Sequence, residues 1–553
     1  MTSIIFTASV TPYRIIELPS EDIEPIAIDG YTLVRSVTVL RHATRLPTED
    51  VIIEMKKILP ELQWMLKKAV QSKKKEGRLV MHNIILLTLE HKGKKSSLSP
   101  NKCYTKEMKQ WKIYEDLEDD DVEMKLLVEE GKREAINFGK RFRTFFKYLL
   151  PEEFDKESII VKFTKCPRTK DTAFNVIEGV FEKSPPGDDW YEEVEGKKSV
   201  LKYDSSCPAW KAFKKSVLNE DLTKNFLNSD YLKGIAKEVA AACGLEEDEF
   251  SVDDLILVYE TCGYEFAWVG SSPWCNLLTE EQMKVLEYVA DLELHVIAGY
   301  GNVLNTKIPC KLYNDLMENL LHNEKLKALI YVTHLTSILK YLAFLGLYRD
   351  TSIDLIIYRG LYDPDIEDRN WRSAYIGTFL TNISTLLFDY TSSFRDENSN
   401  QFIQVRHQER PIHIPSCPLN KELLCPLDIF ERSFENFSYK NCNFDEWCKV
   451  SKIPPEEKKL EKKKSNKSFT VGERRKMLKK EWDARKKAKI DEGTTEKEMH
   501  EKDNRRIKSA GDVGHQKALD EEINDDEPEQ QVKEENFHRL DNFLAEFGDD
   551  FDT

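Results

Sequence analysis

The chain has 553 residues, of which 40% are hydrophobic and 33% are charged, and its formal net charge is −16. This length exceeds one simple core, so we expect two domains with additional segments. The negative charge argues against nucleic acid as a partner. The most apolar window, Ala328 to Tyr348, is interrupted by His334 and Lys340. It therefore predicts a buried strand, a turn and a helix, and no membrane span.

The elements expected along the chain alternate between strands and helices, which predicts an α/β sheet with helices on both faces. The helix from Glu129 to Leu150, for example, spaces its apolar residues by three and four. The region from 182 to 320 breaks the alternation and is mostly helical by pattern. The elements are strands at 34–40, 158–163 and 328–332, with helices at 129–150, at 170–181 and after the third strand.

These patterns divide the chain into four parts. Residues 1–181 and 321–450 are expected to build one α/β core, into which residues 182–320 are inserted as a mainly helical cap domain. Residues 451–553 consist of charge blocks, which predicts a largely disordered or single-helix tail. Near the end, apolar residues from Phe537 to Phe547 share one helical face. This face predicts either a weakly packed terminal helix or a segment that binds a protein partner.

The cysteines indicate an oxidising compartment. Eight of the 11 lie in the second half of the folded region without the paired spacing of metal sites, which predicts disulfides. Sequons at Asn382 and Asn436 suit a glycoprotein of the secretory pathway, in the endoplasmic reticulum lumen or outside the cell. The stretch from Met1 to Arg14 does not predict a signal peptide, and a truncated N-terminus would reconcile these signals. The eight are Cys207, Cys262, Cys275, Cys310, Cys417, Cys425, Cys442 and Cys448.

Three predicted strands end in cationic or imidazole side chains. The first ends in Arg41-His42, with Arg45 close behind, and the others lead to Arg168 and His334. Ligands of open α/β sheets bind beyond the carboxyl ends of strands. Guanidinium groups match phosphate oxygens bidentately, and a neutral histidine among them can attack phosphorus. The sequence therefore predicts a site for phosphate chemistry at this edge.

The motif RHATRLP resembles the RHGxRxP signature of the histidine acid phosphatases, in the histidine phosphatase superfamily. Other stretches, among them TPYR, CPRTKDTAFNVIEGVF, WRSAYIGTFLTN and the long segment from SSPWC to GYGNVLN, resemble multiple inositol polyphosphate phosphatases. The likeness extends from about Thr11 to Phe430. It implies a phosphomonoesterase of inositol polyphosphates, with an α/β core, a helical cap and the substrate between them.

The resemblance also implies roles for individual residues. His42 would be the nucleophile that forms a phosphohistidine, and His334 would complete the site. Arg41, Arg45 and Arg168 would hold the phosphoryl group, so that neither a metal nor a cofactor is needed. Lys165, like the nearby Lys162, either meets peripheral phosphates of the substrate or is simply solvated. Arg372 lies in a family segment without an assigned role.

The chain departs from the family at the proton donor. The family carries His-Ala-Glu at the third strand end and the wider branch His-Asp, whereas this chain has His334-Leu335-Thr336. Loss of a general acid typically costs about 10²- to 10⁴-fold in rate. Ala43 also replaces the glycine of the signature. Two interpretations remain: a phosphatase of reduced activity with another proton source, or a pseudophosphatase that binds phosphorylated ligands or partners.

Overall fold

An eight-stranded mixed sheet forms the centre of the first of two units, residues 1–450 and 451–553. The computed structural model describes residues 10–75, 100–114, 117, 125–183, 187–196, 199–219, 226–350, 369–391, 400–450, 474–480 and 483–484. The predicted segment from Phe537 to Phe547 lies outside these residues. Within the described part, no helix is both long enough and apolar enough to cross a membrane.

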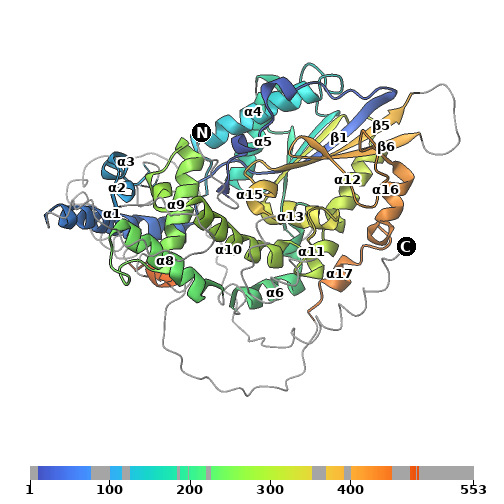
Figure 1. Ribbon diagram of the computed structural model, residues 1–553. Coiled ribbons are helices and arrows are strands. Elements are labelled where there is room, and N and C mark those ends of the chain that lie inside the picture. The colour runs from blue at the N-terminus through green and yellow to red at the C-terminus, as the bar shows by residue number, and fades with distance from the viewer. Residues whose placement is uncertain are drawn as a thin grey trace, which may run out of the picture. The chain divides into compact units, whose positions relative to one another are not determined.

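The strands run in the order β3-β2-β4-β1-β5-β6-β7, and β8 pairs with β6 (Figure 1). The pairs β1–β4, β2–β4 and β2–β3 are parallel, whereas β1–β5 and the pairs beyond it are antiparallel. The α/β prediction is confirmed. The strands are β1 (Tyr31–Arg41), β2 (Ile159–Thr164), β3 (Tyr191–Val194), β4 (Ala328–Thr333), β5 (Asn382–Tyr390), β6 (Gln401–His407), β7 (Arg410–Ile412) and β8 (Cys425–Pro426).

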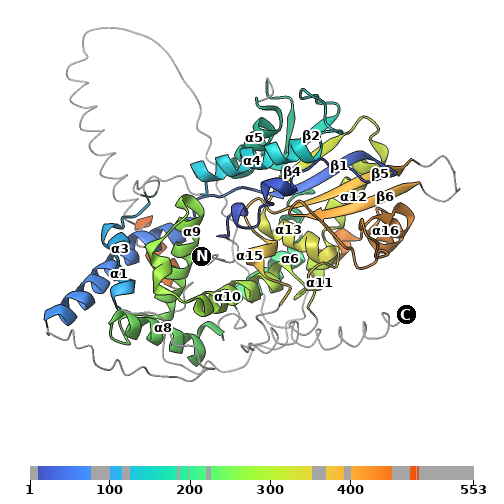
Figure 2. The same ribbon diagram turned by 45° about the horizontal axis from the view of Figure 1, so that its top comes forward.

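Helices cover both faces of this sheet because alternate strand residues face opposite sides. In β4, Leu329 and Tyr331 join a core with α12 and α13, whereas Ile330 and Val332 join a core with α4 and α5. Figures 1 and 2 show these two layers on opposite sides of the sheet. The helices are α4 (Glu129–Phe145), α5 (Pro167–Phe181), α12 (Cys310–His322) and α13 (Leu335–Phe344).

The expected elements are present, with shifted ends. The helix predicted from Lys170 begins at Pro167, because proline suits the first helical position, where no amide donor is needed. The helix predicted to reach Leu150 ends at Phe145. The stretch from 182 to 320 is largely helical, but its first element is β3, which pairs with β2 at the sheet edge.

A separate helical cluster lies beside the sheet in both views (Figures 1 and 2). Its core combines helices from before residue 181 with helices of the predicted insertion, which pack around Trp274. Its members are α1 (Glu49–Lys75), α2 (Pro100–Cys103), α3 (Lys106–Gln110), α8 (Asp230–Cys243), α9 (Val252–Val269) and α10 (Glu280–Ala298).

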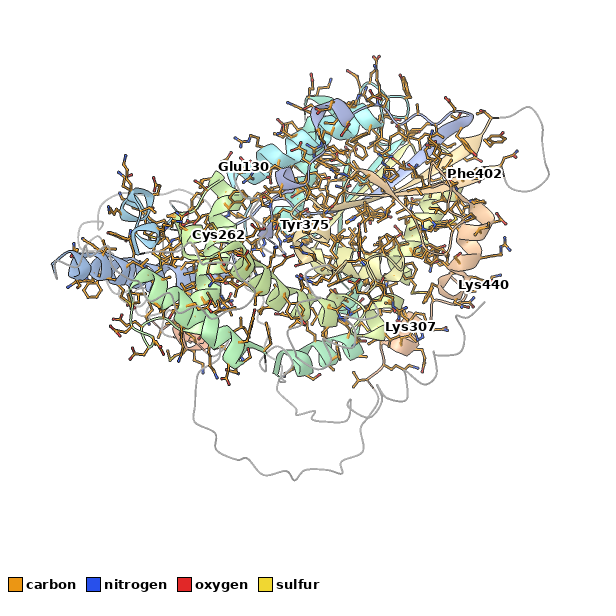
Figure 3. All side chains as sticks on the ribbon, in the orientation of Figure 1. Glu130, Cys262, Lys307, Tyr375, Phe402 and Lys440 are labelled. Atoms are coloured by element: carbon orange, nitrogen blue, oxygen red, sulfur yellow. A yellow bond between two sulfur atoms is a disulfide. The ribbon has the colours of Figure 1, made fainter. Side chains whose placement is uncertain are left out.

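The described residues form five disulfides, three of which join parts of the first unit that are distant in sequence, and all eight cysteines expected to pair do so. The bridge Cys262–Cys275 ties α9 to the following turn (Figure 3, where Cys262 is labelled). Cys166 keeps a free thiol. The other bridges are Cys103–Cys243, Cys207–Cys448, Cys310–Cys442 and Cys417–Cys425.

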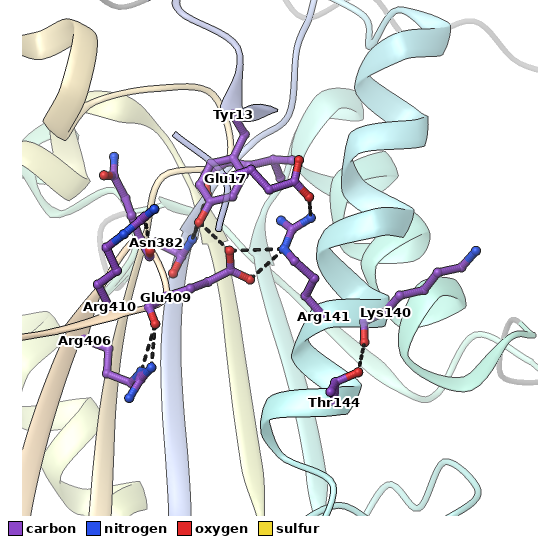
Figure 4. Close-up of polar contacts among 11 residues, drawn as sticks. Tyr13, Glu17, Lys140, Arg141, Thr144, Asn382, Arg406, Glu409 and Arg410 are labelled. Carbon is purple, nitrogen blue, oxygen red and sulfur yellow. Dashed lines mark hydrogen bonds and ion pairs between the residues drawn. The ribbon is translucent and has the colours of Figure 1, made fainter. Parts of the chain in front are cut away.

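A buried polar network ties the TPYR segment to the sheet (Figure 4). The Tyr13 hydroxyl donates to Glu409 over 2.8 Å, and Glu409 also accepts from Arg141 over 3.0 Å. Asn382 donates to the Tyr13 oxygen over 3.1 Å and is 1% exposed. This sequon is therefore inaccessible to a glycan in the folded protein, whereas the sequon at Asn436 is exposed.

Two glycines bring α4 and α5 into backbone contact. A Cβ on Gly139 would lie 2.1 Å from the Val176 carbonyl oxygen, and one on Gly179 would lie 2.1 Å from that of Ile136. Either alanine would force the helices apart. This close packing holds α5, and with it Arg168, against the core.

We predict that Gly139→Ala destabilises the protein by about 1–3 kcal/mol, because overpacking shifts the backbone. Gly234→Ala is the matched control: Gly234 is also helical, but a Cβ there meets nothing within 4 Å. It should leave stability unchanged or raise it by up to about 1 kcal/mol. Urea unfolding of the oxidised proteins measures both, and equal effects of the two substitutions would contradict the packing argument.

Candidate active site

The carboxyl ends of three parallel strands bring the predicted residues together. In the pairing of β1 with β4, Arg41 lies opposite Thr333, so His42 and His334 leave the sheet side by side. Their ring centroids are 5.7 Å apart. From the first turn of α5, which follows β2, Arg168 Nη2 reaches His334 Nδ1 at 3.3 Å. Arg45 is near enough to lower the pKa of both histidines.

His42 is held with one nitrogen available for attack. Its side chain is buried, and Nδ1 lies 3.0 Å from the Ala43 carbonyl oxygen. A carbonyl can only accept, so Nδ1 carries the hydrogen and Nε2 keeps its lone pair. Burial, and then repulsion from Arg41 and Arg45, holds the pKa of His42 well below its usual value. The imidazole is therefore neutral, as a nucleophile must be.

Ala43 fits where the signature has glycine. Its methyl is fully buried, and its backbone conformation is not left-handed. Its amide donates to Thr172 Oγ1 over 2.9 Å, and the Thr172 hydroxyl donates to the Arg168 carbonyl over 2.7 Å. The backbone beside His42 is thus fastened to α5. The methyl group that alanine adds at this position therefore does not widen the site.

The arginines surround His42 at different depths. Arg41 is 3% exposed, lies 4.3 Å from the centre of the Phe379 ring and donates to the Gly377 carbonyl over 2.5 Å. Burial, followed by repulsion from Arg45, lowers the pKa of Arg41 to about 9, so it remains cationic at neutral pH. Burial likewise lowers the pKa of the half-buried Arg168. The three guanidinium groups make a strongly anion-attracting site.

His334 is fixed by Thr164, at the end of β2, and by Arg168, in the first turn of α5. Thr164 Oγ1 lies 3.0 Å from Nε2, and Arg168 donates to Nδ1, so the imidazole is neutral with its hydrogen on Nε2. Burial, and then the charge of Arg168, lowers the pKa of His334 to about 3. A bound anion would compete with His334 for the Arg168 donors.

Where the family has its proton donor, this chain has a hydroxyl backed by a buried ion pair. Thr336 Oγ1 donates to Asp204 Oδ2 over 3.4 Å, and Lys340 Nζ donates to the same oxygen over 2.8 Å. Lys340 is 0% exposed and Asp204 is 5% exposed. Asp204 is also close enough to His334 to affect its pKa.

Two further residues of the sequence analysis have polar partners of their own. Lys165 is exposed, and its Nζ lies 3.3 Å from the exposed carboxylate of Glu195. Arg372 donates from Nε to Glu287 Oε1 over 3.1 Å, so it ties the segment before β5 to α10. Arg372 therefore has a structural partner that accounts for its presence.

The residues that support the site were not predicted from the sequence. Thr164 and Thr172 gave no signal because single threonines are common at strand ends and in helices. Glu134, from α4, accepts from the Thr44 hydroxyl over 2.7 Å and from Arg14 over 2.8 Å. Burial raises the pKa of Glu134 to about 7 despite these partners. Its buried position within the amphipathic helix pattern was the one available clue to its role.

Comparison with known proteins agrees with this geometry. The Histidine phosphatase superfamily (branch 2) matches residues 32–408, most of the chain. The chain belongs to this family. It is 24% identical to multiple inositol polyphosphate phosphatase 1 of Gallus gallus, and the match covers 47% of this chain and 58% of that relative. The chain thus spans less than two thirds of the length of that relative. With the Homo sapiens protein of the same name it shares 21% identity over 69% of the chain and 78% of the relative.

Two solved structures share the fold of this chain. The phytase from D. castellii superposes with a TM-score of 0.57 at 17% identity, covering 80% of this chain and 87% of that one. The Bifidobacterium longum multiple inositol polyphosphate phosphatase, in complex with inositol hexasulfate, gives 0.54 at 11% identity and covers 79% and 98%. The resemblance found in the motifs is confirmed.

The depressed pKa of His334 predicts a pH-dependent contribution to stability. In the unfolded chain this histidine has a pKa of about 6.5, whereas in the folded protein the pKa of His334 is about 3. Between these two values only the unfolded chain binds the proton, so stability is lost as the pH falls from about 6.5 to about 3. Relative to His334→Asn, the wild type should lose up to about 1.4 kcal/mol per pH unit there. Urea unfolding at pH 7, 6, 5 and 4 measures it, and a difference that does not change with pH would refute it.

Proposed function

We propose that the protein is a phosphomonoesterase that removes phosphate from inositol polyphosphates through a phosphohistidine at His42. The observation that carries this proposal is the neutral His42 imidazole, with Nε2 available, beside three guanidinium groups. The relatives and the solved structures with this fold support the phytate-type substrate class.

The chain's own residues supply the chemistry of the first step. Arg41, Arg45 and Arg168 bind the phosphoryl oxygens and offset the charge that builds up during transfer. His42 Nε2 forms a bond to phosphorus while the bond to the leaving oxygen breaks, and that oxygen must gain a proton. In the second step water attacks the phosphohistidine, giving phosphate and restoring His42.

A second candidate function follows from Thr336, which stands where the family has a carboxylic acid. Without a proton source, Arg41, Arg45 and Arg168 would still bind phosphorylated ligands, but the protein would not hydrolyse them. The two candidates differ in one product, because a binding protein has no reason to form a phosphohistidine.

The five disulfides support a location in the secretory pathway, in the endoplasmic reticulum lumen or outside the cell. The segment from Phe537 to Phe547 remains a proposed contact for a protein partner. The charge of −16 continues to argue against nucleic acid.

We expect the protein to release phosphate from inositol hexakisphosphate between pH 4 and 8. Activity should extend further into acid than an unperturbed histidine would allow, because the lowered pKa of His42 favours its neutral form. His42→Ala should reduce release on the order of 10³-fold or more, since the covalent route is lost. Acid-labile phosphate on His42, trapped by rapid quenching, should appear in the wild type alone. Ligand binding without release above the His42→Ala level would favour the second candidate.

We also propose that Lys165 meets a peripheral phosphate of the substrate by exchanging its Glu195 partner for the ligand. Lys165→Ala should then raise KM for inositol hexakisphosphate a few-fold, because one exposed charge contact is worth about 1 kcal/mol or less. KM for a simple aryl monophosphate should not change. Lys156→Ala is the control, since Lys156 is also exposed and paired, with Asp189. Equal effects of the two substitutions would show that Lys165 is only solvated.

A further inference from the structure

A chain of polar groups leads from a buried ammonium to the catalytic edge of the sheet. Lys340, one turn into α13, donates to Asp204 Oδ2, and the same oxygen accepts from the Thr336 hydroxyl. Thr336 follows His334 by two residues and is partly exposed, whereas Lys340 is not exposed at all. The hydroxyl is thus the outer end of the chain and the ammonium its inner end.

The fold places Asp204 at this point by several independent contacts. Asp204 lies in a short 3-10 helix, Tyr203–Ser206, whose Tyr203 hydroxyl donates to the Ser337 carbonyl over 2.8 Å. Both Thr333 and Ser337 donate to the Leu201 carbonyl, over 2.6 and 2.9 Å. The segment from 201 to 206 is therefore docked on the junction of β4 and α13. A carboxylate reaches the family's donor position from a different part of the chain.

Ion pairing alone does not account for this arrangement. Replacing a buried ion pair with apolar residues of similar volume is often neutral or stabilising, so the pair is weak evidence of a stabilising role. Lys340 has one carboxylate partner and the face of Trp210, 4.0 Å from the ring centre. The pair holds a transferable proton, and its carboxylate accepts a hydrogen bond from the hydroxyl of Thr336, two residues after His334.

We propose that Thr336, Asp204 and Lys340 form a proton relay that protonates the leaving alcohol in the phosphatase reaction proposed above, and the inference rests on that function. The Thr336 hydroxyl replaces the missing carboxylic acid as the group that touches the leaving oxygen. Asp204 and Lys340 act through it.

The proton count of the relay balances in both steps. As the bond between phosphorus and the leaving oxygen breaks, the Thr336 hydroxyl turns its hydrogen from Asp204 to that oxygen and gives it up. Asp204 accepts a proton from the Lys340 ammonium and passes it to the Thr336 oxygen. The products are the alcohol, the phosphohistidine and a neutral Lys340 amine. When water attacks the phosphohistidine, its proton returns along the same path and the ammonium is restored.

The pKa values of the buried pair support a relay in which Lys340 carries its proton at neutral pH. Burial lowers the pKa of Lys340 to about 8, although Asp204 raises it. Burial would raise the pKa of Asp204, but the attraction of Lys340 outweighs it and the pKa is lowered. The other groups facing the pair are Tyr203 beside Asp204, Lys214 from α6 (Pro208–Asn219), and His334.

The test compares two substrates that differ in their need for a proton. Inositol hexakisphosphate releases an alkoxide-like oxygen that needs protonation, whereas 4-nitrophenyl phosphate releases a stable phenolate. The quantity measured is kcat/KM, which reports the step in which the leaving group departs. Thr336→Val, which removes the hydroxyl at nearly constant volume, should lower kcat/KM for inositol hexakisphosphate about 10²-fold or more. It should leave the aryl substrate within about 3-fold, since that step does not use the acid.

Two further variants separate the relay from a structural effect. Thr336→Ser keeps the hydroxyl and should retain activity on both substrates. The double variant Asp204→Asn/Lys340→Met removes both charges, so it leaves no buried charge unpaired, and should reproduce the substrate-selective loss of Thr336→Val.

Each outcome bears on one claim. Equal losses on both substrates in Thr336→Val, or no loss on either, would overturn the relay while leaving the phosphatase intact. A wild type that hydrolyses neither substrate and forms no phosphohistidine would overturn the proposed function, and the relay with it. A loss confined to inositol hexakisphosphate, restored by Thr336→Ser, is the expected result.

Discussion

The parallel pairing of β1 with β4 is the constraint on which the site depends. Because Arg41 lies opposite Thr333, the residues that follow each strand emerge together at one edge, as His42 and His334. A slip of one residue would turn every side chain of β1 to the other face of the sheet. Side chains of β1 and β4 enter two different cores in alternation, and a slip would exchange them between these cores. Packing of the core thus fixes the distance between the two imidazoles.

The same packing makes the site electrostatically costly. It gathers three guanidinium groups around buried histidines, and each cation disfavours protonation of its neighbours. Backbone carbonyls and the Phe379 ring offset part of this cost for Arg41. An anion bound among the guanidinium groups would relieve the remaining cost and so stabilise the folded protein.

The core strands and the residues at their ends could be predicted from the sequence because both depend on local signals. Hydrophobic runs located β1, β2 and β4, and a topological rule placed Arg168 and His334 with His42. The supporting groups could not be found this way. Asp204, for instance, reaches Thr336 only through the docking of its segment on α13, and Glu134 reaches Thr44 across an interface between elements. Neither contact is encoded in the spacing of nearby residues.

The residue types at the donor position also bear on the pH at which a proton is available. A carboxylic acid placed among Arg41, Arg45 and Arg168 would have its pKa lowered by the nearby cations, so it would lose its proton in mild acid. An ammonium group starts from a much higher pKa: burial lowers the pKa of Lys340 from 10.5 to about 8, so it stays protonated at neutral pH. In the proposed relay, exchanging the acid for a hydroxyl and a distant ammonium extends proton supply from acid toward neutral pH.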